Sequence, residues 1–339
     1  MLNEIIKLVD INKFELFIKE ENITDEYVIV KPTYMSICAA DQRYYQGKRK
    51  REILDKKLPL SLIHECVGRV IYDGKNVFKS NEKVVLIPNT PTTEDEIIKE
   101  NYLRTSLFKS SSTDGFMQSL LFIRRDRIIS IGDINEEVAS LLELMSVSIN
   151  AIENFKKNSI NRYNKIAIWG PGSVGYVTYL LLKEYFPNTK IAIIGTSREK
   201  LNYFLLAEEK YLVTELEPDF FVDHAFECVG GNGSEMAINQ IIDHINPQGS
   251  ISLLGVSEEK VGINTRMVLE KGLTLLGNSR SGYIDFAKAI EILSGNIKMQ
   301  ENLRKIISDK IEVNTFNDIY VAFDKDRIND YKTVMKWNL

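Results

Sequence analysis

A thiol, an imidazole and a carboxylate, the side chains that bind zinc, occur within the first third of this sequence. Cys38 is followed, further along, by the adjacent pair His64-Glu65. Zinc in proteins is bound by these three kinds of group. A lone cysteine and a distant histidine are more often a coincidence, so spacing alone leaves both a metal site and unrelated structural residues open.

Cysteine and histidine are scarce, and their scarcity excludes several classes of protein. The 339 residues include 3 Cys and 3 His, and no C-x-x-C pattern occurs. An odd cysteine count without such pairs argues against a disulfide framework and a zinc ribbon, and predicts reduced thiols in a cytoplasmic protein. We interpret the remaining members of both sets as structural: Cys66, Cys228, His224 and His244.

A glycine-rich turn provides a second candidate site. The segment 170–175, Gly-Pro-Gly-Ser-Val-Gly, matches G-x-G-x-x-G between a predicted strand at 165–169 and a predicted helix at 176–185. In that context the glycines allow a tight turn and let the backbone approach a pyrophosphate at the positive helix N-terminus. The predicted cofactor-binding residues here are Gly170, Gly172, Ser173, Val174 and Gly175.

The end of the next predicted strand, 190–195, indicates which dinucleotide would bind. An Asp or Glu there would bind the ribose hydroxyls of NAD. The chain instead continues with hydroxyl and cationic residues: Thr196, Ser197, Arg198 and Lys200. Such groups bind a 2′-phosphate, so the sequence predicts NADP(H). Alternatively, Arg198 and Lys200 are solvated charges on a helix, and the acidic Glu199 between them favours this interpretation.

The elements that must position these residues suggest two domains. Residues 1–145 are β-rich and irregular, with predicted strands at 27–32, 68–72 and 83–88 and a helical pattern over 137–155. Six short apolar runs then alternate with helices, at 165–169, 190–195, 211–213, 224–227, 250–254 and 273–277. This alternation predicts an α/β doubly wound parallel sheet. We therefore predict one domain over 1–145, completed by 281–339, and a cofactor domain over 146–280.

Composition excludes other classes of function. Lys+Arg is 43 and Asp+Glu is 47, giving a net charge of −4, and such a chain is a poor candidate for binding nucleic acid. No run of about 18 apolar residues is present, so no membrane span is expected. The N-terminus also lacks the apolar stretch of a signal peptide.

Local sequence strengthens the metal interpretation. The segments 35–41 (MSICAAD) and 63–68 (IHECVG) resemble the zinc-site segments of the medium-chain dehydrogenase/reductase family, and the resemblance covers essentially the whole chain. It implies a GroES-like catalytic domain, a Rossmann cofactor domain, and Cys38 and His64 as ligands of one catalytic zinc. The segment 142–151 (LELMSVSINA) resembles that of polyol dehydrogenases and implies Glu143 as third ligand, although Leu144 replaces the usual Pro.

The same resemblance assigns further roles and shows two departures. It implies that Glu65 binds the zinc or exchanges with water, and that Asp41 orients His64. Ala40 replaces the usual Ser or Thr, so the proton donor stays open among a zinc-bound water, Glu65 and Tyr44. Residues 85–115 contain none of the four cysteines of the usual structural lobe, so no structural zinc is expected.

Four longer segments, 34–47, 58–65, 223–231 and 277–282, resemble the ribulose-5-phosphate reductases of bacterial CDP-ribitol synthesis. That resemblance implies NADPH-dependent reduction of ribulose 5-phosphate to ribitol 5-phosphate, for teichoic acid or capsule. A phosphosugar needs a cationic anchor, for which Arg43 and Arg280 are candidates. The basic run 48–51 is a further candidate for this anchor, but it fits a solvated loop better. Tyr44 either lines the sugar pocket or packs against other side chains of the protein.

The implied partners and the competing functions complete the prediction. The resemblance implies that the chain forms a homodimer or tetramer. It also implies that the ribitol-5-phosphate cytidylyltransferase of the same pathway is a partner. One alternative is a zinc polyol or alcohol dehydrogenase that acts on an unphosphorylated substrate. A second is a non-catalytic NADPH-binding subunit, which Ala40 keeps open.

Overall fold

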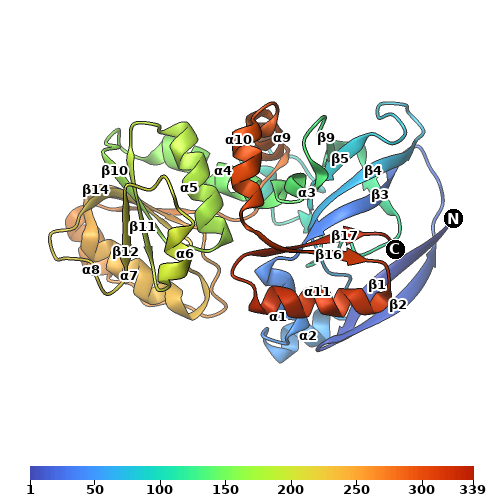
Figure 1. Cartoon of the computed structure of the whole chain (residues 1–339), viewed down its shortest axis with the longest axis horizontal. Coiled ribbons are helices and arrows are strands. Elements are labelled where there is room, and N and C mark those ends of the chain that lie inside the picture. Colours follow the sequence, from blue (N-terminus) through green and yellow to red (C-terminus); the bar gives the residue numbers. More distant parts are fainter. The chain divides into compact units, whose positions relative to one another are not determined.

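Two compact units make up the computed structural model, which describes residues 1–339. The first unit contains Met1–Ser146 and Arg280–Leu339, so both ends of the chain build it, and the second contains Val147–Ser279. The blue and red ribbons of Figure 1 belong to the first unit. None of the helices is long and apolar enough to cross a membrane.

A mixed seven-stranded sheet forms the centre of the first unit. Its strands run in the order β16-β17-β3-β4-β5-β9, with β8 pairing β3. Their bounds are β3 (Tyr27–Ser36), β4 (Glu65–Asp73), β5 (Lys83–Leu86), β8 (Leu121–Arg124), β9 (Ile128–Ser130), β16 (Ile307–Val313) and β17 (Lys332–Trp337). Two strands from the C-terminal end of the chain therefore complete a sheet that its N-terminal part begins.

Two short hairpin-like sheets and several helices surround that sheet. The small sheets pair β1 (Leu2–Asp10) with β2 (Lys13–Glu20), and β6 (Asn89–Thr90) with β7 (Leu107–Phe108). The helices are α1 (Ala39–Tyr45), α2 (Arg51–Lys57), η1 (Glu100–Tyr102), η2 (Arg125–Arg127), α3 (Glu136–Ala139), α9 (Tyr283–Leu293), α10 (Ile297–Arg304) and α11 (Phe316–Ile328). α4 (Leu142–Asn158) runs from the first unit into the second.

The second unit is a six-stranded parallel sheet in the order β12-β11-β10-β13-β14-β15. The strands are β10 (Lys165–Trp169), β11 (Lys190–Gly195), β12 (Glu209–Leu212), β13 (Val222–Glu227), β14 (Ile245–Leu253) and β15 (Thr274–Gly277), and the helices are α5 (Ser173–Tyr185), α6 (Arg198–Asn202), η3 (Gly231–Gly233), α7 (Ser234–His244) and α8 (Thr265–Lys271). Figure 1 shows α5 on one side of the strands and α7 with α8 on the other. The predicted α/β fold class is confirmed.

Local sequence explains where several helices begin. At the start of α3, α6, α8 and α10, a side-chain oxygen of the residue before the helix accepts a hydrogen bond from a backbone N–H of the first turn. These acceptor residues are Asn135, Ser197, Asn264 and Asn296. These residue types stabilise helix N-termini because the first N–H groups have no partner within the helix.

Two of the differences from the sequence-based expectation have a local structural reason. β3 does not end at Pro32 but continues to Ser36, because the register shifts between Pro32 and Tyr34 and an irregular position tolerates the missing N–H. The helix expected over 137–155 is divided into α3 and α4. At the break, the Ser140 hydroxyl donates to the carbonyl of Glu137 at 2.7 Å, which competes with the helical backbone.

Candidate active site

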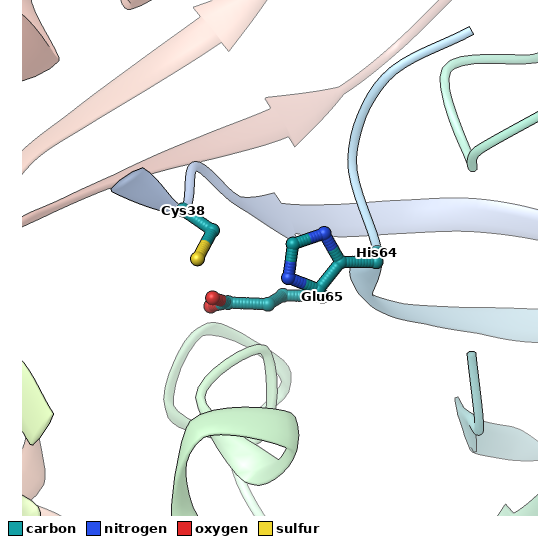
Figure 2. Close-up of side chains that lie close together, drawn as sticks. All are labelled: Cys38, His64 and Glu65. Carbon is teal, nitrogen blue, oxygen red and sulfur yellow. The ribbon is translucent and has the colours of Figure 1, made fainter. Parts of the chain in front are cut away.

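The three candidate metal ligands lie where two antiparallel strands meet. β3 ends opposite the start of β4, with Ser36 paired to Glu65, and Cys38 follows at the start of α1. The Cys38 sulfur, a His64 ring nitrogen and a Glu65 carboxylate oxygen all lie within 4.8 Å of one another. Figure 2 shows the three side chains facing a common space. The structure therefore brings together the residues that sequence alone left as scattered candidates.

The donor set fits a zinc ion. Oxygen Oε2 of Glu65 is buried and has no hydrogen-bond partner, an arrangement that a bound cation would stabilise. Thiolate, imidazole and carboxylate are also the usual ligands of zinc. Cys38, His64 and Glu65 are accordingly the residues that would hold the metal.

Asp41 connects the elements of this cluster. Its fully buried carboxylate accepts hydrogen bonds from Ser110 Oγ at 2.6 Å, from the Ile63 amide at 3.0 Å and from the Cys38 amide at 3.2 Å. Its Oδ2 also lies 3.6 Å from Nδ1 of His64. Burial alone would raise the pKa of Asp41, but His64 and the Ser110 and Ile63 donors outweigh it and lower that pKa. Asp41 is thus an anion that His64 faces.

We expect Asp41→Asn to weaken zinc binding about tenfold to a hundredfold, which is usual when a partner that orients a metal-binding imidazole is lost. The Asn side chain keeps the volume of Asp but loses the charge that faces His64 and one of the two accepting oxygens. Competition with a chromophoric chelator would measure the affinity. An unchanged zinc affinity would show that Asp41 does not orient a ligand.

Glu143, the predicted third ligand, lies nearby but outside the tight cluster. It is in the first turn of α4 and is buried. Burial, with a contribution from Glu65, raises the pKa of Glu143 to about 7, although His64 and Lys332 act in the opposite direction. These interactions place its carboxylate in the electrostatic environment of the cluster. The three ligand atoms that lie within 4.8 Å of one another belong to Cys38, His64 and Glu65.

Lys332 is a buried residue of the site that sequence analysis missed. At the start of β17, its ammonium donates to Glu65 Oε1 and to the carbonyl of Ile37, both at 2.7 Å. Burial by itself would lower the pKa of Lys332, but the Glu65 and Cys38 groups more than offset this, and the pKa is raised. One Glu65 oxygen is therefore paired with a cation, while the other is left for a metal.

The three residues predicted to bind substrate occupy different environments. Arg280 adopts a left-handed backbone conformation, with φ of 58°, and its guanidinium lies 4.8 Å from the ring centre of Phe108. Phe108 in turn lies 5.4 Å from the His64 ring. Arg280 is thus separated from the metal cluster by one aromatic ring. Arg43 is half-buried on α1, whereas Tyr44 packs in the core with the Arg49 guanidinium 4.3 Å from its ring centre.

The glycine-rich turn in the second unit has the backbone geometry that the sequence pattern predicts. Gly170 follows β10 with φ of 105°, and α5 begins at Ser173. A Cβ at Gly175 would lie 2.0 Å from the carbonyl oxygen of Gly170, so only glycine allows the helix to start this close to the strand. Ser173 and Val174 form the first turn of α5, whose N–H groups can bind a phosphate.

The candidate phosphate-binding residues after β11 lie at a helix start. Ser197 caps α6, where its hydroxyl accepts the Lys200 amide at 3.3 Å. Thr196 is exposed, and the exposed Arg198 guanidinium is paired with the Glu215 carboxylate. Because that ion pair is exposed, it would cost little to exchange Glu215 for a phosphate.

A β-rich unit that gathers Cys38, His64 and Glu65, followed by a parallel-sheet unit with a glycine-rich turn, defines a medium-chain dehydrogenase/reductase. Residues 24–133 match the alcohol dehydrogenase GroES-like domain family. The chain is 46% identical over 339 residues to ribulose-5-phosphate reductase 1 of Staphylococcus aureus, covering 99% of both chains.

Two further comparisons extend over the full length. Identity to the ribulose-5-phosphate reductase of Bacillus spizizenii is 43%, covering 100% of both chains. The crystal structure of S. aureus TarJ in complex with NADPH matches with a TM-score of 0.90 and 42% identity, again over 100% of both chains. The chain belongs to the ribulose-5-phosphate reductase family.

Proposed function

We propose that this protein reduces D-ribulose 5-phosphate to D-ribitol 5-phosphate with NADPH and one zinc ion. The Cys38, His64 and Glu65 cluster, in a chain that matches named ribulose-5-phosphate reductases over its whole length, carries the proposal. Hydride passes from C4 of the nicotinamide to C2 of ribulose 5-phosphate, which is its ketone carbon, and a proton adds to the ketone oxygen. NADPH becomes NADP⁺ and the ketone becomes a secondary alcohol.

The residues of the site have distinct roles in this reaction. Cys38, His64 and Glu65 would hold the zinc, with Glu143 close by, and the zinc when bound supplies Lewis-acid polarisation of the ketone. Asp41 fixes the orientation of His64 through its buried carboxylate. Arg280, stacked on Phe108, and Arg43 supply positive charge for the sugar phosphate.

A spectrophotometric assay tests the function directly. Purified protein with its zinc content determined would be mixed with ribulose 5-phosphate and either NADPH or NADH, and cofactor oxidation would be followed in the near ultraviolet. We expect turnover that prefers NADPH. Turnover of an unphosphorylated polyol with NAD would instead favour a polyol dehydrogenase. Bound zinc and NADPH without any turnover would favour a non-catalytic subunit.

Cofactor preference depends, in this proposal, on Arg198. Arg198→Ala should lower kcat/KM for NADPH about tenfold to thirtyfold, because a charge-assisted contact to the 2′-phosphate is lost, and leave kcat/KM for NADH unchanged. Arg266→Ala is a matched control, since Arg266 is an exposed arginine of the same unit that pairs only with Glu270 in its own helix. Equal losses with both cofactors would contradict the assignment.

Assembly and pathway remain separate proposals. We propose that the chain forms a homodimer or tetramer and works with a ribitol-5-phosphate cytidylyltransferase, which would consume its product for teichoic acid or capsule. Light scattering of the pure protein, and of its mixture with the cytidylyltransferase, would test both statements.

A further inference from the structure

Glu227 holds four hydrogen-bond donors on one buried carboxylate. It is the last residue of β13 and has no solvent exposure. Its Oε1 accepts from the Val229 amide at 3.0 Å, the Gly230 amide at 2.9 Å and Ser234 Oγ at 3.4 Å. Its Oε2 accepts from the Gly255 amide at 3.0 Å. Two of these donors lie in the turn after β13 and one in the turn after β14, and the fourth, Ser234, is the first residue of α7.

The two turns, 228–231 and 254–256, are also joined through their backbones. The Gly231 amide donates to the carbonyl of Val256 at 2.9 Å, and the Glu227 carbonyl accepts from the Leu254 amide at the same distance. A Cβ at Gly255 would lie 2.4 Å from Glu227 Oε1, so no side chain fits between the turns. The carboxylate of Glu227 therefore lies between the two turns and joins them.

The glycine-rich turn packs against the same structure. A Cβ at Gly170 would lie 2.7 Å from the carbonyl of Cys228, and the Cys228 amide donates to the carbonyl of Trp169 at 2.7 Å. All three turns follow the carboxyl ends of β10, β13 and β14 in one parallel sheet. Between β10 and β13 the strand order reverses, since β11 and β12 lie on the other side of β10.

This topology determines which part of a dinucleotide each turn faces. Dinucleotides bind across the crevice at such a reversal, with the pyrophosphate at the first glycine-rich turn and the adenosine ribose at the end of the second strand. β11 is that second strand, so the adenosine half lies toward Gly195. The other half must extend in the opposite direction, over the turns that follow β13 and β14.

We propose that Glu227 is a positioning residue for the nicotinamide half of the cofactor. It acts by keeping the turns 228–231 and 254–256 in one fixed arrangement, without contacting the cofactor. The inference rests on the proposed NADPH-dependent function, and it adds a residue whose effect should be confined to one half of the cofactor.

Glu227→Gln tests the proposal because the amide keeps the size of the side chain but turns an N–H₂ group toward backbone N–H donors. The dissociation constants of NADPH and of adenosine 2′,5′-bisphosphate, which lacks the nicotinamide half, would be measured by calorimetry. We expect the constant for NADPH to rise about tenfold or more. The constant for adenosine 2′,5′-bisphosphate should stay within about twofold.

Two further variants make the result decisive. Glu235→Gln is the matched control, because this exposed carboxylate on α7 also accepts a backbone amide, that of Gly262 at 2.8 Å, and both constants should stay unchanged. Glu227→Asp keeps the charge, should give a smaller loss confined to NADPH, and replaces the Gln variant if that one does not fold.

The possible failures can be told apart. An equal loss of affinity for both ligands would mean that Glu227 only stabilises the fold, and no loss for either would mean that it does not position the turns; both results overturn the inference. Failure of the unmodified protein to bind either ligand would instead overturn the proposed use of NADPH, and the inference with it.

Discussion

Replacing His64 with Asn should lower kcat/KM for ribulose 5-phosphate on the order of a thousandfold or more, because the Lewis acid that polarises the ketone is lost. Asn cannot replace the imidazole as a zinc ligand, and the buried Glu65 oxygen loses the cation that would stabilise it. Cys38→Ser should have an effect of the same order, since a hydroxyl is a far weaker ligand than a thiolate. Initial rates and elemental analysis for zinc would measure both consequences.

Cys66→Ala is the matched control for these variants. Cys66 follows His64 by two positions and is fully buried, and burial raises the pKa of its thiol, so the group stays protonated and does not bind metal readily. We expect normal zinc content and activity. Removal of zinc by a chelator should likewise abolish turnover, and added zinc should restore it. His64→Asn protein that retains zinc and full activity would refute the proposed metal site.

Sequence patterns predicted the parts of the site that depend on short segments. The turn 170–175 requires glycine at fixed positions, as the close approach of Gly170 to Cys228 shows, and such a requirement is visible in the sequence itself. Strands β10 and β11 were also predictable, because strands buried on both faces are continuous apolar runs. The end of β3 and the division of the helix at 137–155 could not be predicted, since they depend on local hydrogen bonding.

Residues that act through distant contacts could not be found in this way. Ser110 and Phe108 lie in a polar region without a motif, and only the fold brings them to Asp41 and His64. The pairing of Arg198 with Glu215 is equally invisible in the sequence. Glu227 looked like an ordinary strand residue, because the donors that define its role belong partly to a turn far along the chain.

Lys332 shows this limit most clearly, since 267 positions separate it from Glu65. We expect Lys332→Met to lower the free energy of unfolding of the metal-free protein by about 3 kcal/mol, because the change leaves a buried carboxylate without its cation. The side chains of Lys332 and Glu65 are 7% and 0% exposed, so solvent cannot replace the lost partner. Urea denaturation in the presence of a chelator would measure the change.

Lys336→Met is the control within the same strand. Its ammonium pairs with Glu312 at 2.8 Å, but both side chains are exposed, so water replaces the lost contact and little change is expected. The double variant Glu65→Gln, Lys332→Met should recover much of the lost stability, because it removes both buried charges together. Zinc should also reduce the loss in the Lys332 variant by supplying another cation beside Glu65. Equal stability changes for Lys332→Met and Lys336→Met would contradict the importance of the buried pair.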